Sequence, residues 1–388
     1  MWSKQRAPRG SYPDLAGGTS AWRRLALAAL LALALAPSAR AAGPAPGAQW
    51  QKVAPAAVGL DGAKLAQIAA VAKRGHSNCL VVVRHGELAG EWYFDGTGPN
   101  TTQDVYSATK SFASTLVGIA QDDGDLRIGD RASKWIERWT GTPSEAVTVR
   151  DLLSMDSGRE WNVVTDYLSL LGAPDRTAFA IGLGQDAAPG MEWAYNNSAV
   201  QTLDRVLQKA TGQSVQTFAR TRILAPLGMA HTTMTTDKAG NAQLFSGMHS
   251  TCRDLARFGV LMLDKGRWHG TQIVSSRWVA QATARSSSKL NAAYGYLWWL
   301  NRHGVVASVT AATTLQAVAQ GRMDVGRLVA GAPGSMYWAL GLGDQLIQID
   351  PASQTVVVRL GPAVPIPASP SFGPVEASRV VTEAVRGR

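Results

Sequence analysis

The 388-residue sequence predicts an α+β fold in which one antiparallel sheet is flanked by helices and carries an all-helical lobe. A predicted helix and β-hairpin come near the start of the chain, three strands and a helix come near its end, and the residues between them are mostly helical. Strands from the two ends of the chain can pair in one sheet, and the helices then pack on the faces of that sheet. The alternating strand–helix units that build a parallel sheet do not occur in the sequence.

The first 41 residues have the composition of a secretory signal peptide. A pair of arginines precedes an apolar run, Leu25–Ala36, that is too short to span a bilayer, and Ala39–Ala41 offers small residues for cleavage. We expect cleavage after Ala41 and export to the periplasm or the medium, with no stable membrane anchor. A retained anchor is the alternative.

The mature chain is expected to consist of a linker and one catalytic domain. Residues 42–55 form a Pro/Ala/Gly-rich linker, and residues 56–388 form the domain, with a helical lobe at about 115–250 inserted in its α/β part. Asp61 is the predicted N-cap of a first helix that ends at Gly75. The apolar face of this helix contains Leu65, Ile68, Ala69 and Ala72.

The next predicted elements are a hairpin, a helical region and a return to strands. Cys79–Val83 has the pattern of a buried strand, and the turn at His85–Gly86 leads toward a second strand at Glu91–Phe94. Thr251 with Asp254 predicts a capped helix that runs through Leu263. The predicted C-terminal elements are the strands Tyr337–Leu340, Gln345–Ile349 and Thr355–Leu360 and a helix from about Pro374 to Val385.

Charge, cysteine and histidine usage exclude several function classes. Residues 1–41 hold six Lys and Arg and one Asp, so they carry half of the formal charge of +10, and the remaining basic residues are scattered. This distribution argues against nucleic-acid binding. The six His show no ligand spacing, so we expect no metal and no cofactor. Cys79 and Cys252 fit either a disulfide or two buried free thiols.

Ser107 and Lys110 form an S-x-x-K pattern at the start of an apolar helical stretch. Positions i and i+3 share a helix face with Cβ atoms about 5–6 Å apart, so Lys110 can reach the Ser107 hydroxyl without help from the tertiary fold. Ser needs a base beside it to act as a nucleophile, and a Lys can be that base when burial lowers its pKa. The alternative for Ser107 is a helix N-cap.

Tyr195 and Asn197 form a Y-x-N pattern downstream of the first motif. A Tyr hydroxyl in the same pocket can relay a proton between the nucleophile, its base and the leaving group, whereas a packed aromatic is the alternative for Tyr195. A second S-x-x-K match, Ser286–Lys289, lies in a polar serine run with no strong apolar helix behind it. We interpret this second match as a loop.

With these motifs in this order, residues 55–385 resemble the serine β-lactamase and penicillin-recognising superfamily. The similarity is to its class C-like branch, which includes family VIII esterases and 6-aminohexanoate-dimer hydrolases. The resemblance implies a β-lactamase/transpeptidase-like fold in which Ser107 is acylated, Lys110 is its base and Tyr195 relays the proton. The supporting segments are Val149–Gly158, Pro189–Gly190, Pro226–Met229, Arg253–Gly259, Tyr294–Trp299 and Gly341–Gln345.

The resemblance also assigns the groups that orient the substrate. Asn197 would orient the catalytic lysine and the substrate carbonyl. The backbone N–H of Ser107 and one from Leu342 or Gly343 would form the oxyanion hole. Gly341, Leu342 and Gly343 stand where related enzymes carry a Lys-Thr/Ser-Gly motif, and this sequence contains no such tripeptide.

The missing cation favours small esters or amides over β-lactams as substrates, although Arg302, Arg322 or Arg327 could replace it. We expect an exported serine hydrolase that works through an acyl-enzyme. A penicillin-binding sensor or wall-associated protein that acylates with little turnover is the alternative. The sequence leaves the natural substrate and the oligomeric state open.

The rim of the pocket is expected to come from two segments without a clear period, Arg302–Pro333 and Trp161–Asp175. An apolar rim discriminates one methylene by only about 1–3 kcal/mol, so a permissive enzyme is expected. Core packing is the better interpretation for Trp161 and Tyr167, and a surface or capping role for His249. The aromatic residues considered for the rim are Trp161, Tyr167, Trp298 and Trp299.

Overall fold

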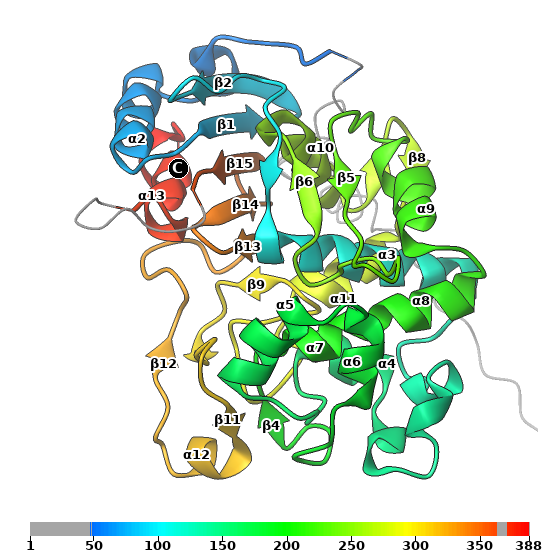
Figure 1. Cartoon of the computed structure of the whole chain (residues 1–388). Coiled ribbons are helices and arrows are strands. Elements are labelled where there is room, and N and C mark those ends of the chain that lie inside the picture. The colour runs from blue at the N-terminus through cyan, green and yellow to red at the C-terminus, as the bar shows by residue number, and fades with distance from the viewer. Residues whose placement is uncertain (1–46, 48, 363–370, 388) are drawn as a thin grey trace, which may run out of the picture. The chain divides into compact units, whose positions relative to one another are not determined.

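Six antiparallel strands form the main sheet, and they come from both ends of the chain. They are β1 (Cys79–Arg84), β2 (Glu87–Tyr93), β9 (Trp299–Leu300), β13 (Tyr337–Gly341), β14 (Gln345–Asp350) and β15 (Thr355–Leu360). In the computed structural model, which describes residues 47, 49–362 and 371–387, their order across the sheet is β2-β1-β15-β14-β13-β9 (Figure 1). The first strands of the chain therefore lie beside the last one.

Most helices lie in the chain between β2 and β9. The α-helices are α2 (Gly62–Arg74), α3 (Thr109–Asp123), α4 (Val149–Ser154), α5 (Leu170–Gly172), α6 (Arg176–Gly182), α7 (Asn197–Gln201), α8 (Leu203–Thr211), α9 (Val215–Ala219), α10 (Cys252–Leu263), α11 (Ser276–Thr283), α12 (Leu315–Ala319) and α13 (Pro374–Arg379). Three segments have π-helical hydrogen bonds: η6 (Thr165–Ser169), η7 (Arg220–Leu224) and η8 (Val380–Ala384). The 3₁₀ turns are η1 (Pro55–Val58), η2 (Tyr106–Ala108), η3 (Ala132–Lys134), η4 (Glu137–Trp139) and η5 (Pro143–Ala146).

The sheet is buried on both faces because its strands alternate their apolar side chains between two cores. In β1, Val81 and Val83 belong to one core, whereas Leu80 and Val82 belong to the other. Helix α10 packs on β1, β14 and β15 from the first side, and α2 with α13 and η8 covers the second (Figure 1). Helix α3 contacts β13 on one side and α8 and α11 on the other, so it joins the sheet to the helical region.

Elements with strong local signals form where the sequence predicts them. Asp61 caps α2, and Gly75 follows its last residue. Thr251 caps α10 by accepting a hydrogen bond from the Asp254 N–H. The β1–β2 hairpin and the three C-terminal strands also form, whereas the predicted last helix is divided into α13 and the π-helical η8.

The predicted signal peptide and its cleavage site lie outside the described residues, and so does part of the predicted linker. A search of the described helices finds none that is both long and apolar enough to cross a membrane.

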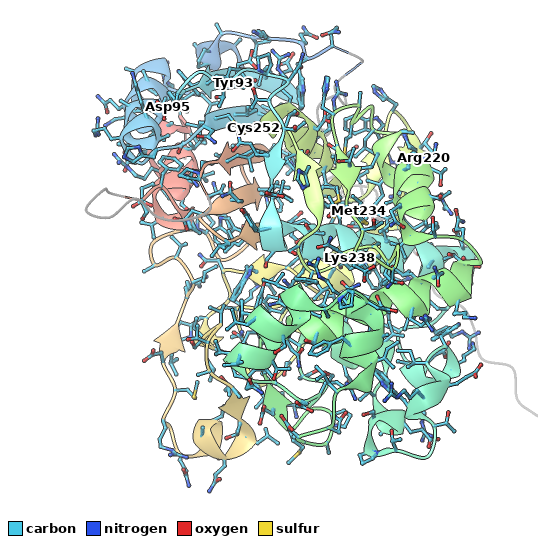
Figure 2. All side chains as sticks on the ribbon, viewed as in Figure 1. Tyr93, Asp95, Arg220, Met234, Lys238 and Cys252 are labelled. Atoms are coloured by element: carbon cyan, nitrogen blue, oxygen red, sulfur yellow. A yellow bond between two sulfur atoms is a disulfide. The ribbon has the colours of Figure 1, made fainter. Side chains whose placement is uncertain are left out.

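Cys79 and Cys252 form a disulfide that joins β1 to the start of α10. Their Cα atoms lie 6.4 Å apart, and the bond links positions separated by 173 residues. Figure 2 labels Cys252 beside the sheet. Of the two alternatives left open by the sequence, the structure therefore contains the disulfide.

The segment 302–333 folds as short pieces that pair in two places. Strand β10 (Gly304–Val305) pairs with β12 (Val325–Gly326), and β11 (Thr313–Thr314) pairs with β4 (Glu192–Trp193) (Figure 1). Strands of two residues are too short to show a hydrophobic period, which is why the sequence did not reveal them. The other short strands are β3 (Gln103–Asp104), β5 (Thr233–Met234), β6 (Met248–Ser250), β7 (Arg267–Trp268) and β8 (Thr271–Gln272).

Candidate active site

Ser107 and Lys110 are in contact at the junction of η2 and α3. Lys110 Nζ donates a hydrogen bond to Ser107 Oγ at 2.9 Å and a second to the backbone carbonyl of Phe245 at 2.8 Å. Ser107 is not the N-cap of α3, because Ala108 holds that position. Tyr106, just before Ser107, has a φ of 46°, a left-handed conformation that is costly for a bulky residue and typical of functional sites.

The side chain of Lys110 is fully buried, and this burial changes its protonation. Desolvation lowers the pKa of Lys110 from 10.5 to about 7, while the negative charge of Asp166 acts in the opposite direction. At neutral pH a substantial fraction of the molecules therefore holds an uncharged amine next to Ser107 Oγ. An uncharged amine can accept the proton that the serine must lose.

Tyr195 lies on the other side of the same serine. Burial raises the pKa of Tyr195, and a hydrogen bond with the Ser107 hydroxyl opposes this shift without reversing it, so the phenol stays protonated. Lys110 Nζ is 4.7 Å from the centre of the Tyr195 ring. The ring packs against Trp299 and Tyr294, with centroid distances of 5.7 and 6.2 Å. These contacts hold the phenol beside Ser107 and the ring beside the lysine.

Asn197 is buried near these groups but makes different contacts from those that the resemblance implies. Within the described chain no hydrogen bond joins Asn197 to Lys110, and the Phe245 carbonyl is the second acceptor of the lysine instead. The Asn197 side chain forms a hydrogen bond with Tyr167, and its Oδ1 is buried without a partner in the structure. Asn197 therefore contacts Tyr167 and not Lys110 in this structure, and it is not among the residues that line the cavity described below.

Asp166 holds the segment that carries Tyr167 against α7. Its carboxylate accepts hydrogen bonds from the backbone N–H groups of Asn197 and Ser198 at 2.8 and 2.7 Å and from the Ser198 hydroxyl at 2.9 Å. Burial raises the pKa of Asp166, and these three donors oppose the shift. Nothing in the sequence marks Asp166, because a lone Asp in an aperiodic segment gives no signal of a partner 31 residues away.

The end of β13 forms the opposite wall of the site. A Cβ atom on Gly341 would lie 2.2 Å from the Val105 carbonyl oxygen and 3.2 Å from the Ala108 nitrogen, so only glycine lets β13 approach the turn that carries Ser107. Leu342, next along the chain, is 60% exposed and borders the same cavity.

A cavity of about 320 Å³ joins these groups. Its size is within the range of small-molecule sites. Gly341 and Leu342 line it but Gly343 does not, so only Leu342 of the two donors that the resemblance implies borders the cavity. The residues that line the cavity are Ser107, Tyr167, Tyr195, Trp299, Val309, Leu340, Gly341, Leu342 and Asp344. A larger cavity, of about 550 Å³, lies by α9, η7 and β5, where Figure 2 labels Arg220 and Met234, and no residue of the S-x-x-K and Y-x-N patterns lines it.

Both predicted rim segments contribute to the cavity, through Val309 and Tyr167. The preference for core packing was wrong for Tyr167, because it is half-buried and lines the cavity. The rim role considered for Trp298 is also wrong, since its ring is fully buried between Phe258 and Tyr337. Trp161 is held by a hydrogen bond from its Nε1 to the Tyr195 carbonyl.

Other residues considered in the sequence lie away from the cavity. Arg302, Arg322 and Arg327 do not line it, and Arg327 donates a hydrogen bond to the Asn301 carbonyl instead. His249 Nε2 lies 2.8 Å from Asp104 Oδ1 between β6 and β3. The second S-x-x-K match lies in a loop, as predicted. Among the described residues, no group of three or more His, Cys, Asp or Glu could hold a metal ion.

Comparison with known proteins agrees with this geometry. A family model described as Beta-lactamase matches residues 64–361. The chain belongs to the Beta-lactamase family. The 6-aminohexanoate-dimer hydrolase of Paenarthrobacter ureafaciens is 25% identical to it, over 60% of this chain and 67% of that protein. Penicillin-binding protein 4 of Amycolatopsis lactamdurans is 31% identical, over 38% of this chain and only 41% of its own length.

Solved structures share the fold of this Beta-lactamase family member. A β-lactamase-like protein from Bacteroides dorei has a TM-score of 0.66 and 20% identity, with 84% of this chain and 98% of that chain covered. The octameric penicillin-binding protein homologue from Pyrococcus abyssi has a TM-score of 0.59 and 18% identity, with 83% and 76% covered. The fold and the family identify the chain as a serine hydrolase of the β-lactamase-related type.

Proposed function

We propose that this protein is an exported hydrolase that cleaves small esters or amides through an acyl-enzyme on Ser107. The observation that carries the proposal is the buried amine of Lys110, which lies 2.9 Å from Ser107 Oγ and has a pKa lowered to about 7. A base with a pKa near the operating pH combines a useful uncharged fraction with a sufficient driving force for proton transfer.

The geometry supports a two-step reaction. Uncharged Lys110 takes the Ser107 proton as Oγ attacks the substrate carbonyl carbon, and the negative charge on the carbonyl oxygen is held by the backbone N–H groups of Ser107 and Leu342. Tyr195 then donates its proton to the departing alkoxide or amine and regains a proton from Lys110. In the second step a water molecule attacks the acyl-serine. The proton transfers of the first step run in the opposite direction, and the acid is released.

The walls of the cavity favour compact, weakly polar acyl groups. Trp299, Val309, Leu340 and Leu342 supply apolar surface, and neither Lys nor Arg is among the described residues that line the cavity. A β-lactam with a carboxylate would thus meet no cation. We expect kcat/KM to be higher for short-chain esters than for nitrocefin, and the reverse order would contradict this choice of substrate class.

Export is supported by two independent features of the chain. The first 41 residues have the composition of a signal peptide, and Cys79 and Cys252 form a disulfide, which persists mainly in oxidising compartments. Mass spectrometry of the protein recovered from the periplasm or the medium should find a new N-terminus after Ala41. Retention of residues 1–41 on a cytoplasmic protein would contradict the proposal.

The two S-x-x-K matches provide a matched test of the nucleophile. Ser107→Ala should lower kcat/KM for p-nitrophenyl butyrate by about 1,000-fold or more, because the acyl-enzyme cannot form. Ser286→Ala changes the serine of the second match, whose Oγ donates to the Ala292 carbonyl in a loop, and should keep activity. Folding of both variants is checked by their thermal midpoints. Activity that survives Ser107→Ala would overturn the proposal.

A penicillin-binding protein that acylates with little turnover is the second candidate, and the penicillin-binding relatives favour it. A fluorescent penicillin that stays attached to Ser107 through denaturation, in a protein without esterase activity, would establish this candidate. Ester turnover without stable labelling would exclude it.

A further inference from the structure

The catalytic cavity has one charged residue among the described residues that line it, and that residue is an acid. Asp344 is half-buried in the turn between β13 and β14, two residues beyond Leu342. The carboxylate also lies against the start of α13, where a Cβ atom on Gly373 would be 3.0 Å from its Oδ1. Any substrate that reaches along the edge of β13 therefore meets a negative charge.

Arg359, the cation whose charge acts on this carboxylate, forms no hydrogen bond with it in the described part of the chain. Arg359 lies beneath the turn, but its guanidinium donates to the Gly343 carbonyl, the Ser77 hydroxyl and the Gly75 carbonyl. Burial raises the pKa of Asp344, the charge of Arg359 lowers it, and the charge of Glu376 on α13 raises it again. Two acids and one base thus leave this corner of the cavity negative.

Aromatic rings form the remaining walls beside Asp344. Tyr167, Tyr195 and Trp299 line the same cavity. The Tyr195 ring already contacts Lys110 Nζ and the Trp299 ring, so Tyr167 and Trp299 supply the aromatic surface that is left for a ligand. The faces of aromatic rings attract cations, above all quaternary ammonium groups, and this attraction is strongest where water is excluded. A carboxylate in a cavity that is also lined by aromatic rings is therefore a chemical match for an ammonium or trimethylammonium group.

We propose that Asp344 and the aromatic walls select ester or amide substrates that carry a cationic group near the bond to be cleaved. This inference rests on the proposed hydrolase function and names the substrate class of that same site. The cation replaces the hydrogen-bonded partner that Asp344 lacks among the described residues. Its attraction to the substrate is electrostatic and thus weakens as the ionic strength rises.

Isosteric substrate pairs test the charge without changing the shape. Butyrylthiocholine is paired with S-(3,3-dimethylbutyl) thiobutyrate, which carries carbon in place of nitrogen in the leaving group. The p-nitrophenyl ester of 4-(trimethylammonio)butanoate is paired with that of 5,5-dimethylhexanoate, which makes the same change in the acyl group. For each pair the readout is the ratio of kcat/KM for the cationic substrate to that for the neutral one. Differences in intrinsic reactivity cancel when this ratio is compared between variants.

We expect the ratio for at least one pair to fall about tenfold in Asp344→Asn, which corresponds to about 1.4 kcal/mol, and further in Asp344→Lys. The φ of Asp344 is 59°, and Asn adopts this left-handed conformation readily, so the turn is kept. Asp95→Asn is the matched control, because Asp95 also has a positive φ, of 51°, but is exposed after β2 at the far edge of the sheet (Figure 2). It should keep the wild-type ratio. Ratios that are equal in the wild type and Asp344→Asn for both pairs would overturn the proposal.

Binding of phenyltrimethylammonium separates this inference from the proposed function. Titration of the full chain by tryptophan fluorescence, with Trp299 in the cavity wall, should give a Kd about tenfold higher for Asp344→Asn than for the wild type. If the wild type binds this cation in an Asp344-dependent way but hydrolyses none of the four esters, the hydrolase function fails and the cation site stands. If it hydrolyses the neutral esters through Ser107 and shows no Asp344-dependent preference or binding, the cation site fails alone.

Discussion

Replacement of Lys110 with Met should stabilise the folded protein at neutral pH while it removes activity. Burial lowers the pKa of Lys110 from 10.5 to about 7, so between these pH values the unfolded chain binds a proton that the folded protein does not. At pH 7 this difference costs the folded state about 4 kcal/mol, since each pKa unit corresponds to about 1.4 kcal/mol. Met has a similar length and no charge to desolvate, so the variant avoids this cost.

Lost contacts offset part of the gain, but they do not change its pH dependence. Without the amine, the buried Phe245 carbonyl loses its donor, which costs about 1–3 kcal/mol. A net gain of about 1–3 kcal/mol is therefore expected at pH 7. The cost of burying Lys110 is complete below pH 7 and disappears as the pH rises toward 10.5. The stability difference between the variant and the wild type should thus fall by about 1.4 kcal/mol per pH unit above pH 7.

Urea denaturation at pH 7, 8 and 9, followed by tryptophan fluorescence, measures this difference. Lys289→Met is the control, because Lys289 is exposed in the loop of the second S-x-x-K match and should show no such slope. The activity of Lys110→Met should fall by about 1,000-fold or more. A stability difference that stays constant from pH 7 to 9 would refute the argument that Lys110 is a lysine with a lowered pKa.

Three further outcomes follow from the same contacts. For a neutral ester, kcat/KM should fall about tenfold per pH unit below a pKa of about 7, because Lys110 must be uncharged, and a pH–rate profile that stays flat from pH 5 to 7 would contradict this role. Replacing Cys79 and Cys252 with Ala should lower the free energy of unfolding by about 5 kcal/mol, the value that the chain-entropy model gives for a bridge between positions 173 residues apart. Equal urea midpoints for the wild type and this variant would contradict the expectation. Gly341→Ala should cut kcat by about 100-fold or more, since its Cβ would lie 2.2 Å from the Val105 carbonyl oxygen and displace β13 from Ser107. Gly98→Ala, with open space around its Cβ, should keep kcat, and full activity of Gly341→Ala would show that β13 can shift without harm.

The parts of the site that depend on local geometry could be predicted from the sequence. The contact between Ser107 and Lys110 is an i, i+3 pair at the start of one helix, so its existence needs no knowledge of the fold. The predicted cap of α2 at Asp61 is local in the same sense. In both cases the interacting groups lie within one or two helical turns, and spacing alone brings them together.

The parts that depend on the fold could not be predicted. The second acceptor for Lys110 is the backbone carbonyl of Phe245, and a carbonyl has no sequence signature because every residue carries one. Asp166 and Tyr167 lie on a π-helical turn in an aperiodic segment, so no pattern marked which of their side chains face the cavity. Residue type alone does not tell which of Trp298 and Trp299 lines the cavity. Neighbouring residues at a strand end face opposite ways, and only Trp299 lines the site.

The pairing of β1 with β15 also determines the order in which the molecule can be completed. Cys79 lies opposite Leu360 in the register, so the pair of β1 and β15 cannot form until nearly all of these residues have been synthesised. Cys252 emerges more than 100 residues before Leu360, so the disulfide can tether β1 to α10 while the apolar edge of β1 still awaits its partner. A chain truncated before Thr355 would keep that edge open, and an unpaired apolar strand edge is a template for aggregation. Strand β15 thus covers the edge of β1, although β1 is synthesised early and β15 late.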